Sequence, residues 1–270
     1  MKRSTTRLGS AMAGALALAV MAMGSPLVTH AATSTSHKPT VVLVHGAFAD
    51  SSSWNGVIRH LQSDGYRVIA APDELRSVKG DAAEVNSLVR SISGPVVLVG
   101  HSYGGPVISE AATGLQNVKA LVYVAAFAPD VGESAAELAG RFPGSTLGPA
   151  LAPPVSLADG GKDLYIDQDK FRAQFAADVP AAQAKLMAVG QRPITDAALH
   201  EASTSAAWKT IPSWFVYGTA DLNIPPAAQA FMAKRAHAKE VEVIKGASHV
   251  VMVSHPDAVA RLIETAALSK

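Results

Sequence analysis

Short apolar runs alternate with segments of helical periodicity along most of this chain. The runs are rich in valine, isoleucine and leucine, which is typical of strands buried on both faces of a parallel sheet. We expect such strands at residues 40–44, 66–71, 95–99, 118–126, 213–217 and 241–244. Apolar residues at intervals of three and four predict helices from residue 52, over 81–92, from the 95–99 strand to about 114, over 227–236 and over 256–267. This alternation predicts an α/β fold with a doubly wound, mostly parallel six-stranded sheet and helices on both faces.

One long interval does not follow the alternation. Residues 131–210 are rich in alanine, proline and glycine, and helical spacing recurs only at 134–138, 170–175 and 181–189. The interval is too long for a loop and has enough apolar side chains to pack on the sheet. We therefore expect one domain, residues 38–270, with an inserted and mostly helical cap over the strand ends, where ligands bind in such folds.

The first 31 residues have the pattern of a secretory signal peptide. Three basic residues precede an uncharged apolar run, Leu8–Met23, and small residues at Ala31 and Ala32 offer a cleavage site. The run is short for a membrane-spanning helix, although a retained anchor is the alternative. We expect cleavage, export to a periplasm or to the medium, and no stable membrane anchor.

Composition narrows the classes of function. Nearly half of the 270 residues are hydrophobic, which is enough for one sizeable core. Without residues 1–31 the chain keeps 20 basic and 22 acidic residues, so no surplus of positive charge favours nucleic acid. The lack of cysteine excludes disulfides, thiol nucleophiles and cysteine-bound metal, and no spacing of histidines and carboxylates suggests a metal site. We expect no cofactor and no metal, and the oligomeric state is left open.

The strand at residues 95–99 runs directly into Gly100-His101-Ser102-Tyr103-Gly104-Gly105. A serine between glycines at a strand-to-helix junction is typical of a nucleophile elbow. The sharp turn strains the serine backbone, presents Oγ at the carboxyl edge of the sheet and brings backbone N–H groups nearby. We predict that Ser102 is a nucleophile; a helix-capping serine at an ordinary junction is the structural alternative.

A serine nucleophile needs a histidine base and a carboxylate that orients it, in the chain order Ser, acid, His for this kind of sheet. His249 follows the last predicted strand, and Asp221 follows the strand before it. We predict these two as base and acid. Asp130, after the fourth strand, is a rival acid, and His200 in the cap is a rival base. A loop-capping aspartate is the structural alternative for either acid.

Acyl transfer also needs two N–H donors for the developing oxyanion. The elbow supplies the N–H of Tyr103, and the loop after the first strand supplies that of Ala47, with Phe48 as second choice. In the same loop, His45 is expected to form hydrogen bonds that shape the loop and to transfer no proton.

Four segments together resemble the α/β-hydrolase superfamily over nearly the whole mature chain: residues 44–47, 100–105, 218–221 and 247–249. The early His-Gly strand and residues 126–130 look most like the branch that contains plant methyl esterases, hydroxynitrile lyases and similar bacterial esterases. The resemblance implies a six-stranded parallel core, a helical cap and cofactor-free hydrolysis of a carboxylic ester. It also implies that Ser102, Asp221 and His249 occupy the triad positions of the family.

Three positions at which this chain differs from other members of the superfamily reduce the number of activities to consider. Hydroxynitrile lyases of this type have a threonine at the position of Gly46 and a lysine at that of Val250, and dehalogenases and epoxide hydrolases have an aspartate at that of Ser102. We therefore predict a secreted carboxylesterase that cleaves small or medium apolar esters through an acyl-serine intermediate. The alternatives are a lactonase or perhydrolase with the same triad, an activated-amide hydrolase, or a homologue that binds a small ligand and hydrolyses slowly or not at all.

Overall fold

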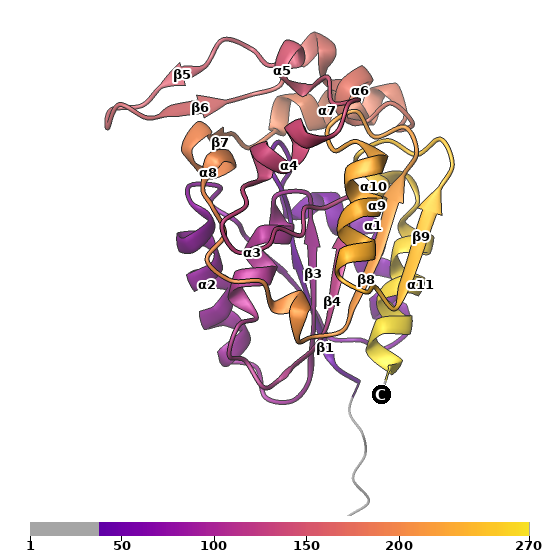
Figure 1. The fold of residues 1–270 in the computed structure, drawn as a ribbon. Helices are drawn as coiled ribbons and strands as arrows, with labels where there is room; N and C mark the ends of the chain where they lie inside the picture. Colours follow the sequence, from indigo (N-terminus) through magenta and orange to yellow (C-terminus); the bar gives the residue numbers. More distant parts are fainter. Residues whose placement is uncertain (1–37, 270) are drawn as a thin grey trace, which may run out of the picture. The chain divides into compact units, whose positions relative to one another are not determined.

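A six-stranded parallel sheet, in the order β2-β1-β3-β4-β8-β9, forms the centre of the protein (Figure 1). The structure is a computed structural model that describes residues 38–269, so the expected signal segment lies outside the described residues. The strands are β1 (Thr40–Val44), β2 (Val68–Ala71), β3 (Val96–His101), β4 (Val118–Val124), β8 (Ser213–Gly218) and β9 (Glu240–Ile244). The predicted α/β fold is confirmed.

Helices cover both faces of this sheet. The helix α1 (Asn55–Ser63), preceded by the short turn η1 (Ser51–Trp54), packs against α11 (Pro256–Leu268) on one face, and α2 (Val78–Arg90) packs against α3 (Gly104–Ala111) on the other (Figure 1). The helix α9 (Pro226–Arg235) contacts β8, and α10 (Val251–Ser254) lies directly before α11. The strands β1 and β3 are therefore buried at every residue, which explains their nearly continuous runs of valine and leucine.

The predicted ends of the elements differ from the observed ones by a few residues. The helix predicted over 81–92 spans Val78–Arg90, because the Ser77 side chain accepts a hydrogen bond from the Gly80 N–H and starts the helix earlier. The apolar periodicity does not show this helix start, because the capping serine precedes the first apolar residue of the repeat.

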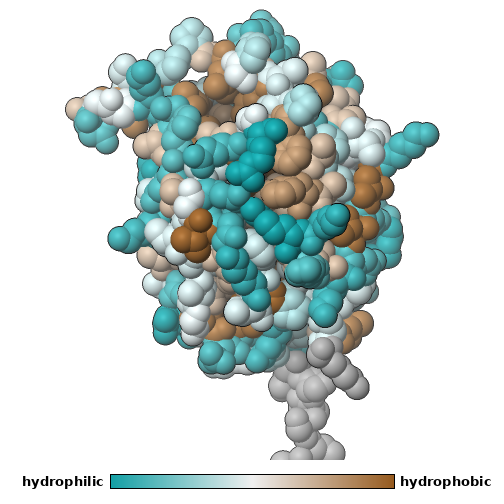
Figure 2. Space-filling model, in the orientation of Figure 1, coloured by the Kyte–Doolittle hydropathy of each residue, from teal (hydrophilic) through white to brown (hydrophobic). Residues whose placement is uncertain are grey.

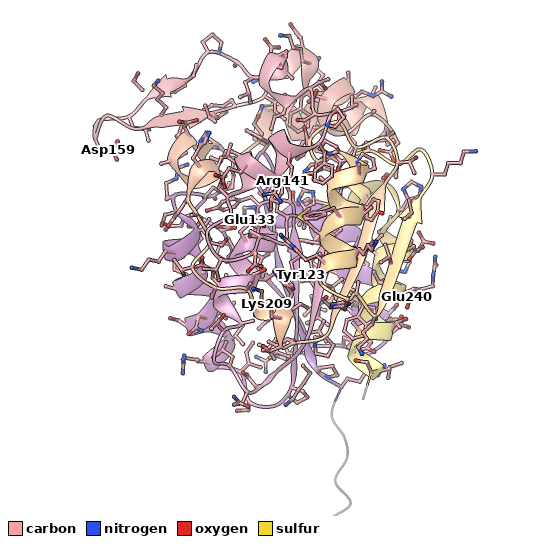
Figure 3. All side chains as sticks on the ribbon, viewed as in Figure 1. Tyr123, Glu133, Arg141, Asp159, Lys209 and Glu240 are labelled. Carbon is pink, nitrogen blue, oxygen red and sulfur yellow. The ribbon has the colours of Figure 1, made fainter. Side chains whose placement is uncertain are left out.

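Most of the segment between β4 and β8 lies over the carboxyl ends of the strands, whereas its end, which includes Lys209, lies lower along the sheet (Figures 1 and 3). It holds α4 (Ala135–Arg141), α5 (Leu147–Ala150), α6 (Gln168–Phe175), α7 (Ala181–Gly190), α8 (Asp196–His200) and η2 (Ala207–Lys209). It also holds a small antiparallel sheet of β5 (Val155–Ser156), β6 (Lys162–Leu164) and β7 (Ile194–Thr195), which the sequence analysis does not predict. Strands of two or three residues are too short to show an alternating pattern.

The loop between β2 and α2 ties this cap to the core. The Thr195 N–H of β7 donates to the Leu75 carbonyl over 3.1 Å, and its hydroxyl donates to the Arg76 carbonyl over 2.8 Å. The Arg76 guanidinium pairs with Asp163 of β6 at 2.5 Å and donates to the Pro193 carbonyl. These contacts fix the position of β6 and β7 relative to the loop that follows β2.

The surface seen in Figure 2 mixes hydrophilic and apolar residues, and the hydrophobic ones gather in several small patches. Between residues 38 and 269, no helix has both the length and the hydropathy required to cross a bilayer.

Candidate active site

The loops that follow β1, β3, β8 and β9 carry the predicted site residues. Ala47 follows β1, Ser102 and Tyr103 follow β3, Asp221 follows β8, and His249 follows β9. Because the carboxyl ends of parallel strands share one edge of the sheet, these loops meet beneath the cap. Ala47, Ser102, Tyr103 and His249 line one cavity of about 340 Å³.

Ser102 has a strained backbone. Its φ of +52° lies in the left-handed region, which a serine rarely adopts. The turn is held by two hydrogen bonds to the Ser102 carbonyl, from the N–H of Gly105 at 3.0 Å and from that of Phe127 at 3.2 Å. Gly46 packs directly on the turn, and a Cβ at that position would lie 2.7 Å from the Ser102 Cβ. The glycine is therefore required by close approach rather than by its own backbone conformation.

Asp221 and His249 form a buried hydrogen-bonded pair. His249 Nδ1 lies 2.8 Å from Asp221 Oδ2, and His249 and Asp221 are 1% and 2% exposed respectively. Asp221 Oδ1 accepts from the N–H groups of Asn223 at 2.8 Å and Ile224 at 3.0 Å, and Oδ2 also accepts from the Gln229 side chain at 2.9 Å. These donors fix the orientation of the Asp221 carboxyl group.

The Asp221 contact sets the state of His249. A carboxylate only accepts hydrogen bonds, so Nδ1 carries the proton and Nε2 has the free lone pair. Among residues 38–269, neither Ser102 Oγ nor His249 Nε2 has a hydrogen-bond partner, and both residues line the same cavity.

Two further aromatic residues hold the His249 loop, and the sequence analysis missed both. His101 Nε2 donates to the His249 carbonyl over 3.2 Å, and the two rings lie 4.8 Å apart. Burial is the main cause that lowers the pKa of His101 well below its usual value, and the neighbouring His249 lowers it further, so this ring is neutral. Phe175 of α6 packs on His249 with a ring separation of 5.1 Å. The position of His101 directly before Ser102 is the one feature of the sequence that could have indicated its role in the site. No feature of the sequence indicates that Phe175 contacts His249.

The N–H groups of Ala47 and Tyr103 are free to bind an oxyanion. Neither has an acceptor within the described part of the chain, and both residues line the cavity. The second choice, Phe48, is wrong, because its N–H donates to the Arg192 carbonyl over 3.0 Å.

His45 lies in the loop that carries Ala47. Its Nδ1 contacts the Gly46 carbonyl at 3.0 Å, and its Nε2 accepts from the Asp73 N–H at 3.1 Å. Burial lowers the pKa of His45. The ring is therefore a neutral structural bridge, with its proton on Nδ1.

The cavity wall is mostly apolar. Besides the residues already named, it is lined by Phe127, Ala135, Ala136, Ala139, Leu147, Gly148, Leu151, Leu164, Leu199 and Ile224, with polar groups from Ser145, Asp196, His200 and Asn223. Most of these residues come from the cap or from the loops that contact it, so the cap determines the shape of the cavity.

The rival residues lie elsewhere or are exposed. Asp130 pairs with Lys209 at 2.5 Å and does not contact His249; Lys209 lies well below the cap in Figure 3. His200 lines the cavity, but 63% of its side chain is exposed, and its neighbour Asp196 lies 3.6 Å away. Over residues 38–269 no group of three histidines or carboxylates could hold a metal ion.

Comparison with known proteins identifies the family. The alpha/beta hydrolase family matches residues 41–262. The chain belongs to this family. An alpha/beta hydrolase of Aspergillus novofumigatus, nvfD, is 30% identical over 251 residues, which are 85% of this chain and 97% of the fungal protein. Esterase PIR7B of Oryza sativa subsp. japonica is 26% identical over 250 residues, or 83% and 93% of the two chains.

Solved structures have the same fold. Polyneuridine aldehyde esterase superposes with a TM-score of 0.74 at 20% identity, over 85% of this chain and 99% of its own. A methylesterase from Arabidopsis superposes with a TM-score of 0.69 at 18% identity, over 86% and 100%. The resemblance deduced from the sequence motifs is confirmed, and this alpha/beta hydrolase is an enzyme of the carboxylesterase type.

Proposed function

We propose that this alpha/beta hydrolase is a secreted serine esterase that cleaves carboxylic esters of small or medium apolar substrates through an acyl-serine intermediate. One observation carries the proposal: the buried Asp221–His249 pair reaches the cavity that the strained Ser102 also lines. Nucleophile, base and orienting carboxylate thus meet at one edge of the sheet.

In the first half of the reaction, Ser102 Oγ attacks the ester carbonyl carbon. His249 Nε2 takes the hydroxyl proton, and Asp221 stabilises the imidazolium that forms. The carbonyl oxygen becomes an oxyanion between the N–H groups of Ala47 and Tyr103. The tetrahedral intermediate then loses its alcohol: the carbon–oxygen bond breaks, His249 returns the proton to the leaving oxygen, and the acyl group stays on Ser102.

In the second half, water attacks the acyl-serine. His249 takes a proton from the water as its oxygen bonds to the carbonyl carbon, and it then protonates Ser102 Oγ as the carboxylic acid leaves. The free enzyme is restored, and the net reaction consumes one ester and one water.

The cavity supports the proposed substrate size. Its volume of about 340 Å³ lies at the small end of the range that ligand pockets occupy, about 300–1,000 Å³. Alanine and leucine are the most frequent residues in its walls, and they favour apolar acyl or alcohol groups through burial.

Export rests on the sequence pattern of residues 1–31. Mass spectrometry of the protein recovered from outside the cytoplasm of an expressing bacterium tests it. Cleavage after Ala31 gives a mature chain that starts at Ala32; an intact Met1 on cytoplasmic protein would contradict export.

The activity is tested with aryl esters of graded acyl length. The mature wild-type protein should hydrolyse them and should be labelled by a fluorophosphonate, whereas Ser102→Ala should lose both properties. Equal rates for the two proteins would exclude the mechanism. Tight ligand binding by Ser102→Ala with no turnover by the wild type would favour a ligand-binding protein.

A further inference from the structure

Tyr103, one of the two proposed oxyanion donors, is also held by its side chain. The phenol is fully buried, and its O–H donates to Asp81 Oδ2 over 3.0 Å. Burial and the neighbouring Asp81 raise the pKa of Tyr103, so the phenol keeps its proton. Asp81 lies in the first turn of α2. A helix outside the catalytic loops therefore contacts the residue that directly follows Ser102.

Asp81 in turn lies next to a second buried carboxyl group, that of Asp73. The two carboxyl groups lie within hydrogen-bonding reach of each other, and Asp81 and Asp73 are 4% and 1% exposed. Asp73 Oδ1 accepts from the Leu75 N–H over 3.3 Å, whereas Oδ2 has no N–H or O–H donor within the described residues. A hydrogen bond between two carboxyl groups requires a proton on one of them, since two buried charges would repel. Asp81 accepts from the Tyr103 O–H and from the Arg76 N–H, whereas burial and the adjacent Asp81 raise the pKa of Asp73 well above its usual value. We therefore assign the proton to Asp73.

Asp73 also reaches the other oxyanion loop. Its backbone N–H donates to His45 Nε2 over 3.1 Å, and His45 Nδ1 donates to the Gly46 carbonyl over 3.0 Å. Gly46 precedes Ala47 and packs on the elbow, where a Cβ at position 46 would lie 3.1 Å from the Tyr103 nitrogen. One hydrogen-bonded chain of buried groups thus joins the two loops that carry the proposed donors.

We propose that Asp73 and Asp81 are positioning residues of the oxyanion site, which hold Tyr103 through its phenol and the Ala47 loop through His45 so that both N–H groups converge on one oxygen. The proposal rests on the proposed function and deepens it. Neither aspartate lines the cavity. They act through Tyr103 and His45, and they touch no part of the substrate.

The position of such donors affects the rate directly. An oxyanion donor is effective about 2.7–3.1 Å from the charged oxygen, and its complete removal costs about 10²–10³ in kcat. Loosening Tyr103 without removing its N–H should cost less than that. We expect Tyr103→Phe and Asp81→Leu to lower kcat by about tenfold, with KM within about twofold of the wild-type value, because the donor acts mainly in the transition state.

Asp81→Asn is the conservative variant. Its amide oxygen still accepts from the Tyr103 phenol, and its amide N–H can donate to a carboxyl oxygen of Asp73. It should therefore recover most of the kcat lost in Asp81→Leu. Tyr123→Phe is the matched control, because Tyr123 is an equally buried tyrosine whose O–H bonds to Ser109 at 2.7 Å and which does not line the cavity. It should keep the wild-type kcat.

The deciding experiment compares kcat and KM with the inhibition constant of an alkyl trifluoromethyl ketone, which forms a tetrahedral oxyanion on a serine nucleophile. The inhibition constant should rise about tenfold in Tyr103→Phe, recover in Asp81→Asn relative to Asp81→Leu, and stay unchanged in Tyr123→Phe. Circular dichroism checks that each variant folds, and Tyr103→Phe, which removes one oxygen, decides the outcome if Asp81→Leu does not.

Two failures can be told apart. Wild-type kcat and inhibition constants in Tyr103→Phe and Asp81→Asn, beside an inactive Ser102→Ala, would overturn the positioning role and leave the esterase mechanism intact. Equal losses in Tyr123→Phe would also overturn it, since the effect would then follow from lost packing. A wild-type protein that hydrolyses no ester would overturn both proposals.

Discussion

Replacing Asp73 with asparagine should change how the stability of this enzyme depends on pH. The pKa of Asp73 in the folded protein is raised well above its usual value of 3.8, first by burial and then by Asp81. Between the unfolded and the folded pKa, the unfolded chain has lost a proton that the folded chain retains. The wild-type protein therefore loses stability as pH rises through this window, and the loss is absent below about pH 4.

The size of the effect follows from the same linkage. Each unit by which the folded pKa exceeds the unfolded one costs about 1.4 kcal/mol at pH values above the folded pKa. The asparagine side chain cannot ionise, so the free energy of unfolding of Asp73→Asn does not fall with rising pH for this reason. Its amide oxygen can accept from Leu75 and its amide nitrogen can donate to Asp81, which preserves both contacts of the protonated acid. The second amide hydrogen has no partner among the described residues and costs about 1–3 kcal/mol at every pH.

The difference between the two proteins is therefore read from the pH dependence and not from a single pH. Urea unfolding at pH values from 4 to 9 should show Asp73→Asn gaining on the wild type as pH rises. If thermal unfolding is measured instead, each unit by which the Asp73 pKa is raised corresponds to a rise in the Tm of Asp73→Asn, relative to that of the wild type, of about 3–5 °C for a domain of this size. The other titratable groups near the pair, His45, Arg192 and Glu74, are the same in both proteins, so their contributions largely cancel in the comparison.

A second aspartate supplies a control of opposite sign. Lys209 beside Asp130 lowers the pKa of that carboxyl, so its contribution is present above the unfolded pKa and is lost as pH falls. Asp130→Asn should therefore lose stability relative to the wild type at neutral pH and not in acid, by no more than about 1 kcal/mol for a surface pair. Parallel stability curves for the wild type and Asp73→Asn would refute the assignment of the proton to Asp73.

Three further substitutions test the site itself. Asp221→Asn should lower kcat by about 10⁴ with little change in Tm, because the amide favours the wrong histidine tautomer, whereas Asp130→Asn should retain full activity in the same ester assay. Gly46→Ala should lower kcat/KM by at least about 10²-fold, since its Cβ would lie 2.7 Å from the Ser102 Cβ; unaltered kinetics would contradict the close approach. Leu151→Trp should shift the preference towards shorter acyl or alcohol groups by filling the 340 Å³ cavity, and an unchanged chain-length profile would mean that substrates bind elsewhere.

Much of the framework can be predicted from the sequence because it depends on local patterns. The strands β1 and β3 are apolar runs bounded by turn residues, and parallel pairing then brings their carboxyl ends to one edge. Candidates for the serine, the acid and the histidine are therefore expected at that edge, in the chain order that is typical of this kind of sheet. Candidates such as Asp221 and His249 can be selected because each directly follows a strand.

The contacts that hold these residues could not be predicted in the same way. Asp73 and Asp81 lie eight positions apart, one in a loop and one in α2, and no periodicity predicts that their carboxyl groups meet. Phe175 reaches His249 only through the fold of the cap, and Gln229 reaches Asp221 from the next helix. Such contacts depend on how elements pack, which composition and spacing do not encode.

The two sides of the site are held by different interactions. On the oxyanion side, directional hydrogen bonds through Asp81 and Asp73 hold Tyr103, and they come from the core. On the base side, the ring of Phe175 from the cap packs on His249, and Nδ1 is the one atom of the imidazole ring that a directional bond fixes among the described residues. In the proposed reaction this difference matches the demands on each group. The N–H donors must stay at one point, since a shift of a few tenths of an ångström weakens them, whereas Nε2 must exchange a proton with three different oxygens in turn: those of serine, the leaving alcohol and water. Apolar ring packing around one fixed bond holds the imidazole without competing for that nitrogen.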